Sequence, residues 1–157
     1  MKKLIAIFLT LVCALVMVGC DNAKQTEATT YSFRGEHDYF AISNGTIVLS
    51  DTEEIFDGGD LHITQSDVLN EIDSYSTTFY AIIDGERRTI LSNSVIDQTG
   101  SAINVEGNLG KSSGKGVIIG SKVENIDELK DNLWFELETT DLDGDENVYQ
   151  IQLTFSN

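Results

Sequence analysis

Four acidic side chains gather in one short stretch of the sequence, Asp141-Leu142-Asp143-Gly144-Asp145-Glu146. Carboxylates spaced in this way on a loop can surround a hard cation, since Ca²⁺ takes about six to eight oxygen ligands. Asp141, Asp143, Asp145 and Glu146 are therefore candidate calcium ligands. The pattern departs from an EF-hand loop, because glycine stands fourth and the twelfth position is not a glutamate. A plain solvated hairpin is the alternative, since Asp-Gly between alternating strands favours a turn.

A second acidic group flanks Gly58-Gly59 and comprises Asp51, Glu53, Glu54, Asp57 and Asp60. These carboxylates would suit a second cation or a basic ligand, or they protect the exposed edge of a strand. The sequence Gly110-Lys111-Ser112 suggests a phosphate-binding loop at first sight. That interpretation fails, because Val105 stands where the motif needs its first glycine and no long helix is predicted to follow.

The two histidines and the single tryptophan are further candidates. A histidine beside carboxylates, as His37 is, can act as a base, a zinc ligand or a pH-responsive group. The chain contains no G-x-S-x-G elbow for such a base to serve, and we expect both His37 and His62 to be exposed. Trp134 falls on the polar side of a strand together with Glu136 and Glu138, where its ring would suit a sugar or a cation. The alternative is that residues 123–129 cover it.

Short β-favouring runs separated by turn signals must position these residues. The predicted strands cover residues 31–33, 39–42, 46–49, 61–63, 79–83, 89–96, 102–106, 117–119, 133–138 and 149–155. Asn44-Gly45 and Asp84-Gly85-Glu86 are predicted hairpin turns, and residues 107–116 are predicted to form a Gly/Ser/Lys-rich loop. Only residues 66–73 and 123–131 are expected to form short helical turns. This density of strands favours an all-β fold, an antiparallel β-sandwich of immunoglobulin-like size, with a small β-barrel as the alternative.

The N-terminal segment has the pattern of an export signal. Met1-Lys2-Lys3 precedes an apolar run over residues 4–18, which as a helix would span about 22 Å, short of the ~30 Å hydrocarbon core. Met17-Val18-Gly19-Cys20 then resembles the lipobox of bacterial lipoproteins. The resemblance implies a signal peptide over residues 1–19, a lipid on Cys20, a flexible tether over 20–30 and a domain over 31–157. A plain secretory signal with an incidental Cys20 is the alternative.

This interpretation fixes the expected chemistry of the domain. Cys13 would be cleaved off and Cys20 would carry the lipid, so the folded domain would have no thiol. Without Lys2 and Lys3 the chain has 8 basic groups against 26 acidic ones, a net charge of −18. Nucleic acid is excluded as a partner, because binding it relies on clustered Lys and Arg. The membrane is the expected partner, through the lipid.

The stretch that begins Tyr31-Ser32-Phe33-Arg34-Gly35-Glu36 and the closing LWFELETTDLDGDENVYQIQL resemble small, uncharacterised lipoproteins of Gram-positive bacteria. The resemblance implies a β-rich domain held on the extracellular face of the cell membrane, and it carries over no functional residues. We therefore expect a non-enzymatic binding or interaction module whose ligand is a protein or a cell-wall component. A structural or envelope-stress lipoprotein without a specific ligand, and a hydrolase, are the alternatives.

Overall fold

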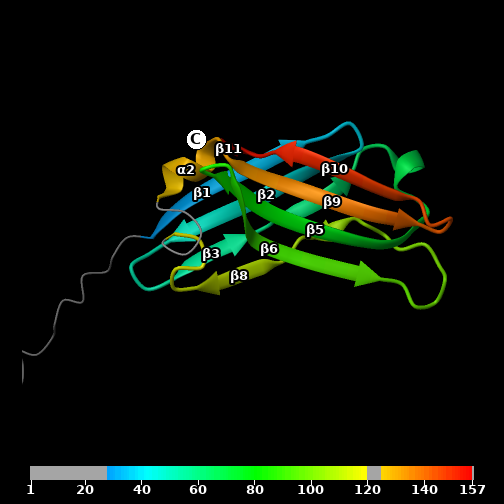
Figure 1. Cartoon of the computed structure of the whole chain (residues 1–157). Helices are drawn as coiled ribbons and strands as arrows, with labels where there is room; N and C mark the ends of the chain where they lie inside the picture. The colour runs from blue at the N-terminus through cyan, green and yellow to red at the C-terminus, as the bar shows by residue number, and fades with distance from the viewer. Residues whose placement is uncertain (1–27, 120–124, 157) are drawn as a thin grey trace, which may run out of the picture.

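Two antiparallel β-sheets pack face to face and enclose one hydrophobic core in the computed structural model, which describes residues 28–119 and 125–156 (Figure 1). This confirms the predicted antiparallel sandwich, and the sheets are not joined into a barrel. The predicted signal peptide, Cys20 and most of the predicted tether lie outside the described residues, although Thr29 and Thr30 already belong to the first strand.

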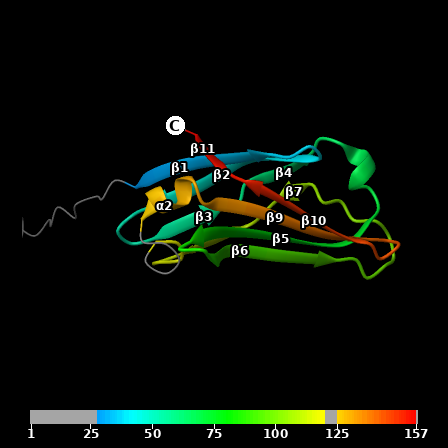
Figure 2. The same cartoon turned by 45° about the horizontal axis from the view of Figure 1, so that its top comes forward.

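The first sheet has seven strands in the order β11-β1-β2-β3-β8, with β4 and β7 attached beside β2 (Figure 2). Its strands are β1 Thr29–Glu36, β2 Phe40–Leu49, β3 Glu54–Asp57, β4 Asp60–Ile63, β7 Gly107–Asn108, β8 Lys111–Gly114 and β11 Thr154–Ser156. The second sheet has the order β10-β9-β5-β6. Its strands are β5 Ile72–Ile83, β6 Glu86–Ile96, β9 Leu133–Asp141 and β10 Glu146–Gln152.

The helical structure among the described residues is confined to the two predicted segments. A 3-10 turn, η2, covers Ser66–Val68, and the helix α2 covers Ile126–Lys130. The Asn125 side chain accepts a hydrogen bond from the Glu128 backbone N–H and so caps α2. The hairpin at Asp84-Gly85 is also confirmed, because both residues adopt the positive φ angles that a type I′ turn needs.

The predicted hairpin at Asn44-Gly45 is wrong, because β2 continues through both residues without reversing direction. Phe33 pairs with Gly45 and Gly35 pairs with Ile42, which leaves one extra residue on β2. Asn44 absorbs this bulge with a φ of 60°. Gly45 is needed beside it, since a Cβ atom there would lie 2.2 Å from Cε2 of the Phe33 ring. The Asn-Gly pair therefore bends a strand instead of reversing it.

The neighbouring strands of the first sheet break at the same level. Gly58-Gly59 separates β3 from β4, both of which pair with β2, and Leu109-Gly110 separates β7 from β8. The two breaks are hydrogen-bonded to each other: the Gly58 N–H donates to Gly110 O at 2.9 Å, and the Leu109 N–H donates to Gly59 O at 2.8 Å. We call this line, with the β2 bulge, the glycine bend.

The course of residues 102–119 also differs from the sequence prediction. The predicted loop over 107–116 contains β7 and β8, whereas the predicted strand over 102–106 is irregular. Residues 117–119 do not form a strand either, because their backbone finds a side-chain partner. The Ile118 and Ile119 N–H groups both donate to Oε2 of Glu54, at 2.8 and 2.9 Å.

Five buried phenylalanines join the two sheets, each exposed by 2% or less: Phe33, Phe40, Phe56, Phe79 and Phe135. Phe33 and Phe56 stack at 5.4 Å between ring centroids within the first sheet. Phe79 of the second sheet meets Phe56 at 5.1 Å and Phe135 at 5.0 Å. Phe40 closes the group against Phe135 at 5.9 Å. Stacked and edge-to-face ring contacts of this kind stabilise the core by about 0.5–1.5 kcal/mol each beyond the burial of area.

The glycine bend generates the first testable prediction. Gly59 has a φ of +74°, and a Cβ atom there would lie 2.1 Å from the Ser43 carbonyl oxygen. Gly85 has a φ of +78° but no atom within 4 Å of its Cβ position. We expect Gly85→Ala to cost only the conformational strain of about 1–2 kcal/mol and Gly59→Ala to cost at least about 3 kcal/mol. Urea denaturation measures both, and equal losses would contradict the role of the bend.

Candidate functional site

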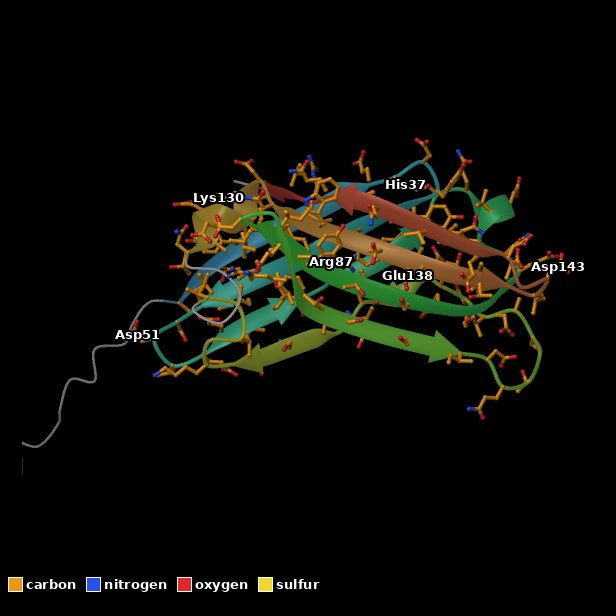
Figure 3. The ribbon with its side chains drawn as sticks, viewed as in Figure 1. His37, Asp51, Arg87, Lys130, Glu138 and Asp143 are labelled. Carbon is orange, nitrogen blue, oxygen red and sulfur yellow. The ribbon has the colours of Figure 1, made fainter. Side chains whose placement is uncertain are left out.

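The outward side chains of β10, β9, β5 and β6 form an exposed sheet surface, which we call the outer face. Alternate residues of a strand point to opposite sides of the sheet, so the register fixes which residues share this face. Three rows cross the strands: Gln150-Glu136-Thr78-Ser92, Val148-Glu138-Ser76-Ser94 and Glu146-Thr140-Ser74-Ile96. Figure 3 labels Arg87 and Glu138 on this sheet.

A charged network occupies one half of the outer face. Glu136 is 5% exposed although it stands on the solvent side of β9, because Arg87 of β6 reaches over the sheet and binds both of its carboxylate oxygens, at 2.9 and 2.5 Å. The Gln150 amide donates to the same carboxylate. The guanidinium also covers the Tyr80 ring, with Cζ 3.8 Å from the ring centroid. These side chains are fixed in place by one another.

The network shifts the pKa values of Glu136, Arg87 and Tyr80. The hydrogen bonds from Arg87, opposed by burial and aided by Gln150, hold the pKa of Glu136 below its ordinary value. The same contact raises the pKa of Arg87. Burial, reinforced by the Glu136 charge, raises the pKa of Tyr80. All three shifts favour one state at neutral pH, with Glu136 charged, Arg87 charged and the tyrosine hydroxyl protonated.

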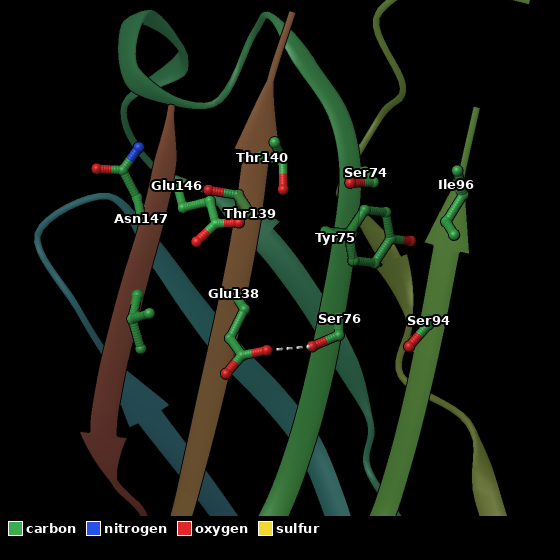
Figure 4. A pocket seen from close by; sticks show the side chains of 11 residues that line it. Ser74, Tyr75, Ser76, Ser94, Ile96, Glu138, Thr139, Thr140, Glu146 and Asn147 are labelled. Carbon is green, nitrogen blue, oxygen red and sulfur yellow. Dashed lines mark hydrogen bonds between the residues drawn. The ribbon is translucent and has the colours of Figure 1, made fainter. Parts of the chain in front are cut away.

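A hollow of about 310 Å³ lies on the other half of the outer face, towards the β9–β10 hairpin (Figure 4). Hydroxyl groups of Ser74, Ser76, Ser94 and Thr140 line it together with the carboxylates of Glu138 and Glu146. Ser76 donates to Glu138 at 3.0 Å. Two aliphatic side chains stand at opposite edges of the hollow, Val148 on β10 with 59% of its surface exposed and Ile96 on β6 with 68%.

Trp134 lies on the outer face as its alternation predicts, half-buried and in register with Tyr80 of β5 and Gln152 of β10. It belongs to the row beyond Glu136 and does not line the hollow. The Gln152 amide beside it donates to the Asp131 carbonyl.

The predicted calcium loop is a tight hairpin in the structure. Asp141 accepts hydrogen bonds from the backbone N–H groups of Asp143 and Asp145, at 3.0 and 2.8 Å. Its carboxylate therefore closes the turn, with Gly144 at a φ of +88°. Within the part of the chain that the structure describes, no three His, Cys, Asp or Glu side chains stand close enough to share a metal ion. A calcium site at Asp141, Asp143, Asp145 and Glu146 stays a prediction.

The acidic group around Gly58-Gly59 has structural partners. Asp57 accepts from the Gly59 N–H at 3.0 Å, and Glu54 holds residues 118 and 119 as described above. Asp60 accepts from the Asn44 and Asn108 amides, at 3.0 and 3.4 Å. These two hydrogen bonds, that of Asn44 first, hold the pKa of Asp60 below its ordinary value. The structure thus places Asp57 and Asp60 at the glycine bend, whereas Asp51 and Glu53 lie in the β2–β3 turn and Glu54 begins β3.

The two histidines occupy different environments. His62 is exposed as expected, with Nε2 3.1 Å from Ser43 Oγ. The prediction that His37 is exposed is wrong, because its ring is half-buried and stacks on Phe40 at 4.9 Å. Tyr39 and Tyr149 close round it at 5.2 and 5.5 Å. The Tyr39 N–H donates to His37 Nδ1 at 3.3 Å, which uses the lone pair that a zinc ion would need at that nitrogen.

The Arg87–Glu136 pair is the feature that the sequence did not reveal. The two residues are separated by 49 positions, and each follows a pattern typical of exposed strand residues. The alternation of β9 correctly places Glu136 on the polar side, but only the pairing of β6, β5 and β9 brings the arginine over it. Lys111 and Ser112 lie in the short strand β8, where a phosphate-binding loop would need the start of a helix.

The network predicts a pH-dependent loss of stability in Arg87→Met. Without the guanidinium, the carboxylate of Glu136 loses its ion pair, although its side chain is only 6% exposed. We expect this loss to lower the free energy of unfolding by about 1–3 kcal/mol at pH 7. This estimate is below the range for fully buried pairs, because Arg87 is 42% exposed. The pKa of Glu136 is lower in the folded chain than in the unfolded chain. The ion pair therefore stabilises the fold at pH values above the unfolded pKa, and this stabilisation is lost as the pH falls through the folded pKa.

The difference between wild type and Arg87→Met should therefore shrink below about pH 4.5. Urea denaturation at several pH values measures this, with Arg34→Met, an exposed cation of β1, as the control that should change stability by less than about 0.5 kcal/mol. A difference independent of pH would contradict the assignment to Glu136.

Comparison with protein-family models, with curated proteins and with solved structures finds no match to this chain. Among residues 28–119 and 125–156, no helix has both the length and the apolar character needed to cross a membrane.

Proposed function

We propose that the chain is a lipid-anchored protein on the extracellular face of the cell membrane and that its sandwich is a non-enzymatic binding module. Anchoring is supported by the sequence: a basic start, an apolar run over residues 4–18 and the lipobox-like Met17-Val18-Gly19-Cys20. Two acyl chains on Cys20, at about 0.8 kcal/mol per buried methylene, would hold the protein stably where one chain would not.

The hollow on the outer face is the observation that carries the binding role. Here short side chains, serine and threonine, leave a depression between Val148 and Ile96, the two most exposed large aliphatic side chains that the structure describes. A hollow with several hydrogen-bonding groups beside exposed apolar ones can offer a ligand both polar and apolar contacts.

The chemistry of the lining indicates the groups that a ligand would present. Hydroxyl groups both donate and accept hydrogen bonds, whereas ionised carboxylates only accept. With Glu138 and Glu146 in the lining, the hollow suits a ligand that offers hydroxyl or amino donors between small apolar groups. A cell-wall polymer or an extended protein segment has this character. The Glu136 network occupies the adjacent row of the same strands and does not line the hollow.

Anchoring leads to a direct prediction. If Cys20 carries the lipid, Cys20→Ala should abolish membrane retention after processing and accumulate an uncleaved precursor, because the lipobox cysteine is itself the processing signal. Fractionation of cells and intact-mass measurement of the protein check this. Recovery of the wild-type protein from the medium with an unmodified N-terminus would contradict it.

The hollow leads to a second prediction, tested by thermal shift of the full chain in detergent micelles with soluble cell-wall fragments and extended peptides. A ligand at ten times its dissociation constant should stabilise the protein by about 1.4 kcal/mol. Ser76→Phe, which fills the hollow from β5, should abolish the shift. Ser113→Phe, an exposed position on β8 of the other sheet, should retain it. A shift that survives Ser76→Phe would place the ligand elsewhere.

A further inference from the structure

Strand β6 has the longest free strand edge among the described residues. Its 11 residues pair with β5 on one side only, and β6 ends the order of the second sheet (Figures 1 and 2). At the opposite end of that sheet, β10 continues through Leu153 into β11 of the first sheet. The outermost strands of the first sheet, β11 and β8, have only three and four residues.

Beyond the bulge at Ile90, where the register with β5 shifts by one residue, the edge of β6 lacks the usual protection against pairing. Proteins blunt such edges with charges, prolines or very short strands. The stretch from Thr89 to Ile96 (TILSNSVI) contains neither a charged residue nor a proline. Val95 and Ile96 are exposed by 40% and 68% at its end. In a chain with 26 acidic residues, eight consecutive uncharged residues on a free edge indicate a surface that pairs with another strand.

We propose that β6 pairs in antiparallel fashion with β6 of a second copy of this chain, about a two-fold axis at Asn93. The axis would join two four-stranded sheets into one continuous sheet of twice the width. A two-fold interface must complement itself, so the sequence of β6 has to match its own reverse. The proposal does not depend on lipid anchoring.

The side chains of β6 meet that requirement. Leu91 and Val95 both point towards the core side, since they pair with Phe79 and Tyr75 of β5. An axis at Asn93 sets Leu91 of each copy opposite Val95 of the other copy, so that apolar side chains face each other in both pairs. On the outer side, the same register sets Ser92 opposite Ser94. Cross-strand pairs of these kinds stabilise a sheet.

The charges at the two ends of β6 favour an antiparallel partner. Arg87 and Arg88 stand at its start and Asp97 follows its end. Hydrogen bonds from Ser101 and Thr99 fix the Asp97 carboxylate, and that of Ser101 in the first place lowers its pKa, so it is charged at neutral pH. In the antiparallel pair each arginine end comes to the Asp97 end of the second copy, whereas a parallel pair would set arginine against arginine. The remaining negative charge is screened beyond about 8 Å at physiological ionic strength.

The pairing has a consequence for the outer face. Ser94 and Ile96 belong both to the free edge and to the lining of the hollow. Two copies joined through β6 would therefore hold their hollows side by side on one sheet surface. An extended ligand would then contact both hollows at once.

The first test is sedimentation of the full chain in detergent micelles over a range of concentrations. We expect a dimer whose fraction rises with concentration. Val95→Lys sets an ammonium group against Leu91 of the second copy, whereas in the single chain this position is 40% exposed and lets the ammonium group reach solvent. The substitution should raise the dissociation constant at least tenfold. Val148→Lys, an equally large change on β10, should not alter it. A wild-type monomer at every concentration, as expected if β6 takes another protein's strand, or a dimer that survives Val95→Lys, would overturn the proposal.

The second test fixes the register without disturbing the fold. Residues directly opposite in antiparallel strands have Cα atoms about 5 Å apart, within disulfide reach. A mixture of Ser92→Cys and Ser94→Cys chains should therefore form a linked dimer under mild oxidation. Either variant alone places its cysteines about 7 Å apart, and should link much less. The wild-type chain is the control, since any disulfide-linked dimer that it forms must go through its own cysteines, Cys13 and Cys20. Equal linking in all samples would overturn the axis at Asn93.

Discussion

The contact between five phenylalanine rings and the glycine bend is the constraint on which the fold depends. Phe33 lies over Gly45, and Phe79 comes so close to Gly58 that a Cβ atom there would stand 2.7 Å from its ring. The rings of the two sheets can interlock only because the first sheet offers backbone without side chains at this level. The bulge in β2 and the breaks at Gly58-Gly59 and Leu109-Gly110 are therefore one device repeated in neighbouring strands, and they are linked by hydrogen bonds across the sheet.

Many of the acidic side chains of this chain accept hydrogen bonds from backbone N–H groups at turns and breaks. A bent sheet leaves backbone N–H groups that no neighbouring strand can satisfy, and a buried unsatisfied N–H costs about 1–3 kcal/mol. Carboxylates satisfy several of them: Asp57 at Gly59, Glu54 at Ile118 and Ile119, Glu106 at Ile63. Asp141 does the same inside the β9–β10 hairpin. Clusters that look like metal sites in the sequence thus include acids that each hold a separate turn.

The sequence predicts those parts of the fold that rest on local pattern. The period of two in residues 133–138 and 149–152 and the turn at Asp84-Gly85 have their expected structures, because each depends on neighbours a few positions away. The predicted run over 149–155 is divided at Leu153, where the chain passes into β11 of the first sheet. Asn44-Gly45 does not, since its geometry is set by Phe33 and by the break between β3 and β4 at Gly58-Gly59. The same holds for the site. Alternation assigns Glu136 and Trp134 to the outer face, but the arginine over Glu136 and the hollow beside Glu138 arise from strands distant in sequence.

The two edges of the sandwich differ from each other, and so do its two ends. One side is closed by the passage of the chain from β10 to β11, whereas the other presents the free edge of β6. Along the long axis, the loop with Asp51 lies at the end where β1 begins, and Asp143 lies at the opposite end (Figure 3). The hollow opens near that opposite end, since Glu146 and Thr140 of its lining flank the hairpin. A lipid on Cys20 would hold the β1 end near the bilayer, so that the hollow faces outward while pairing through β6 proceeds sideways, in the plane in which anchored copies meet.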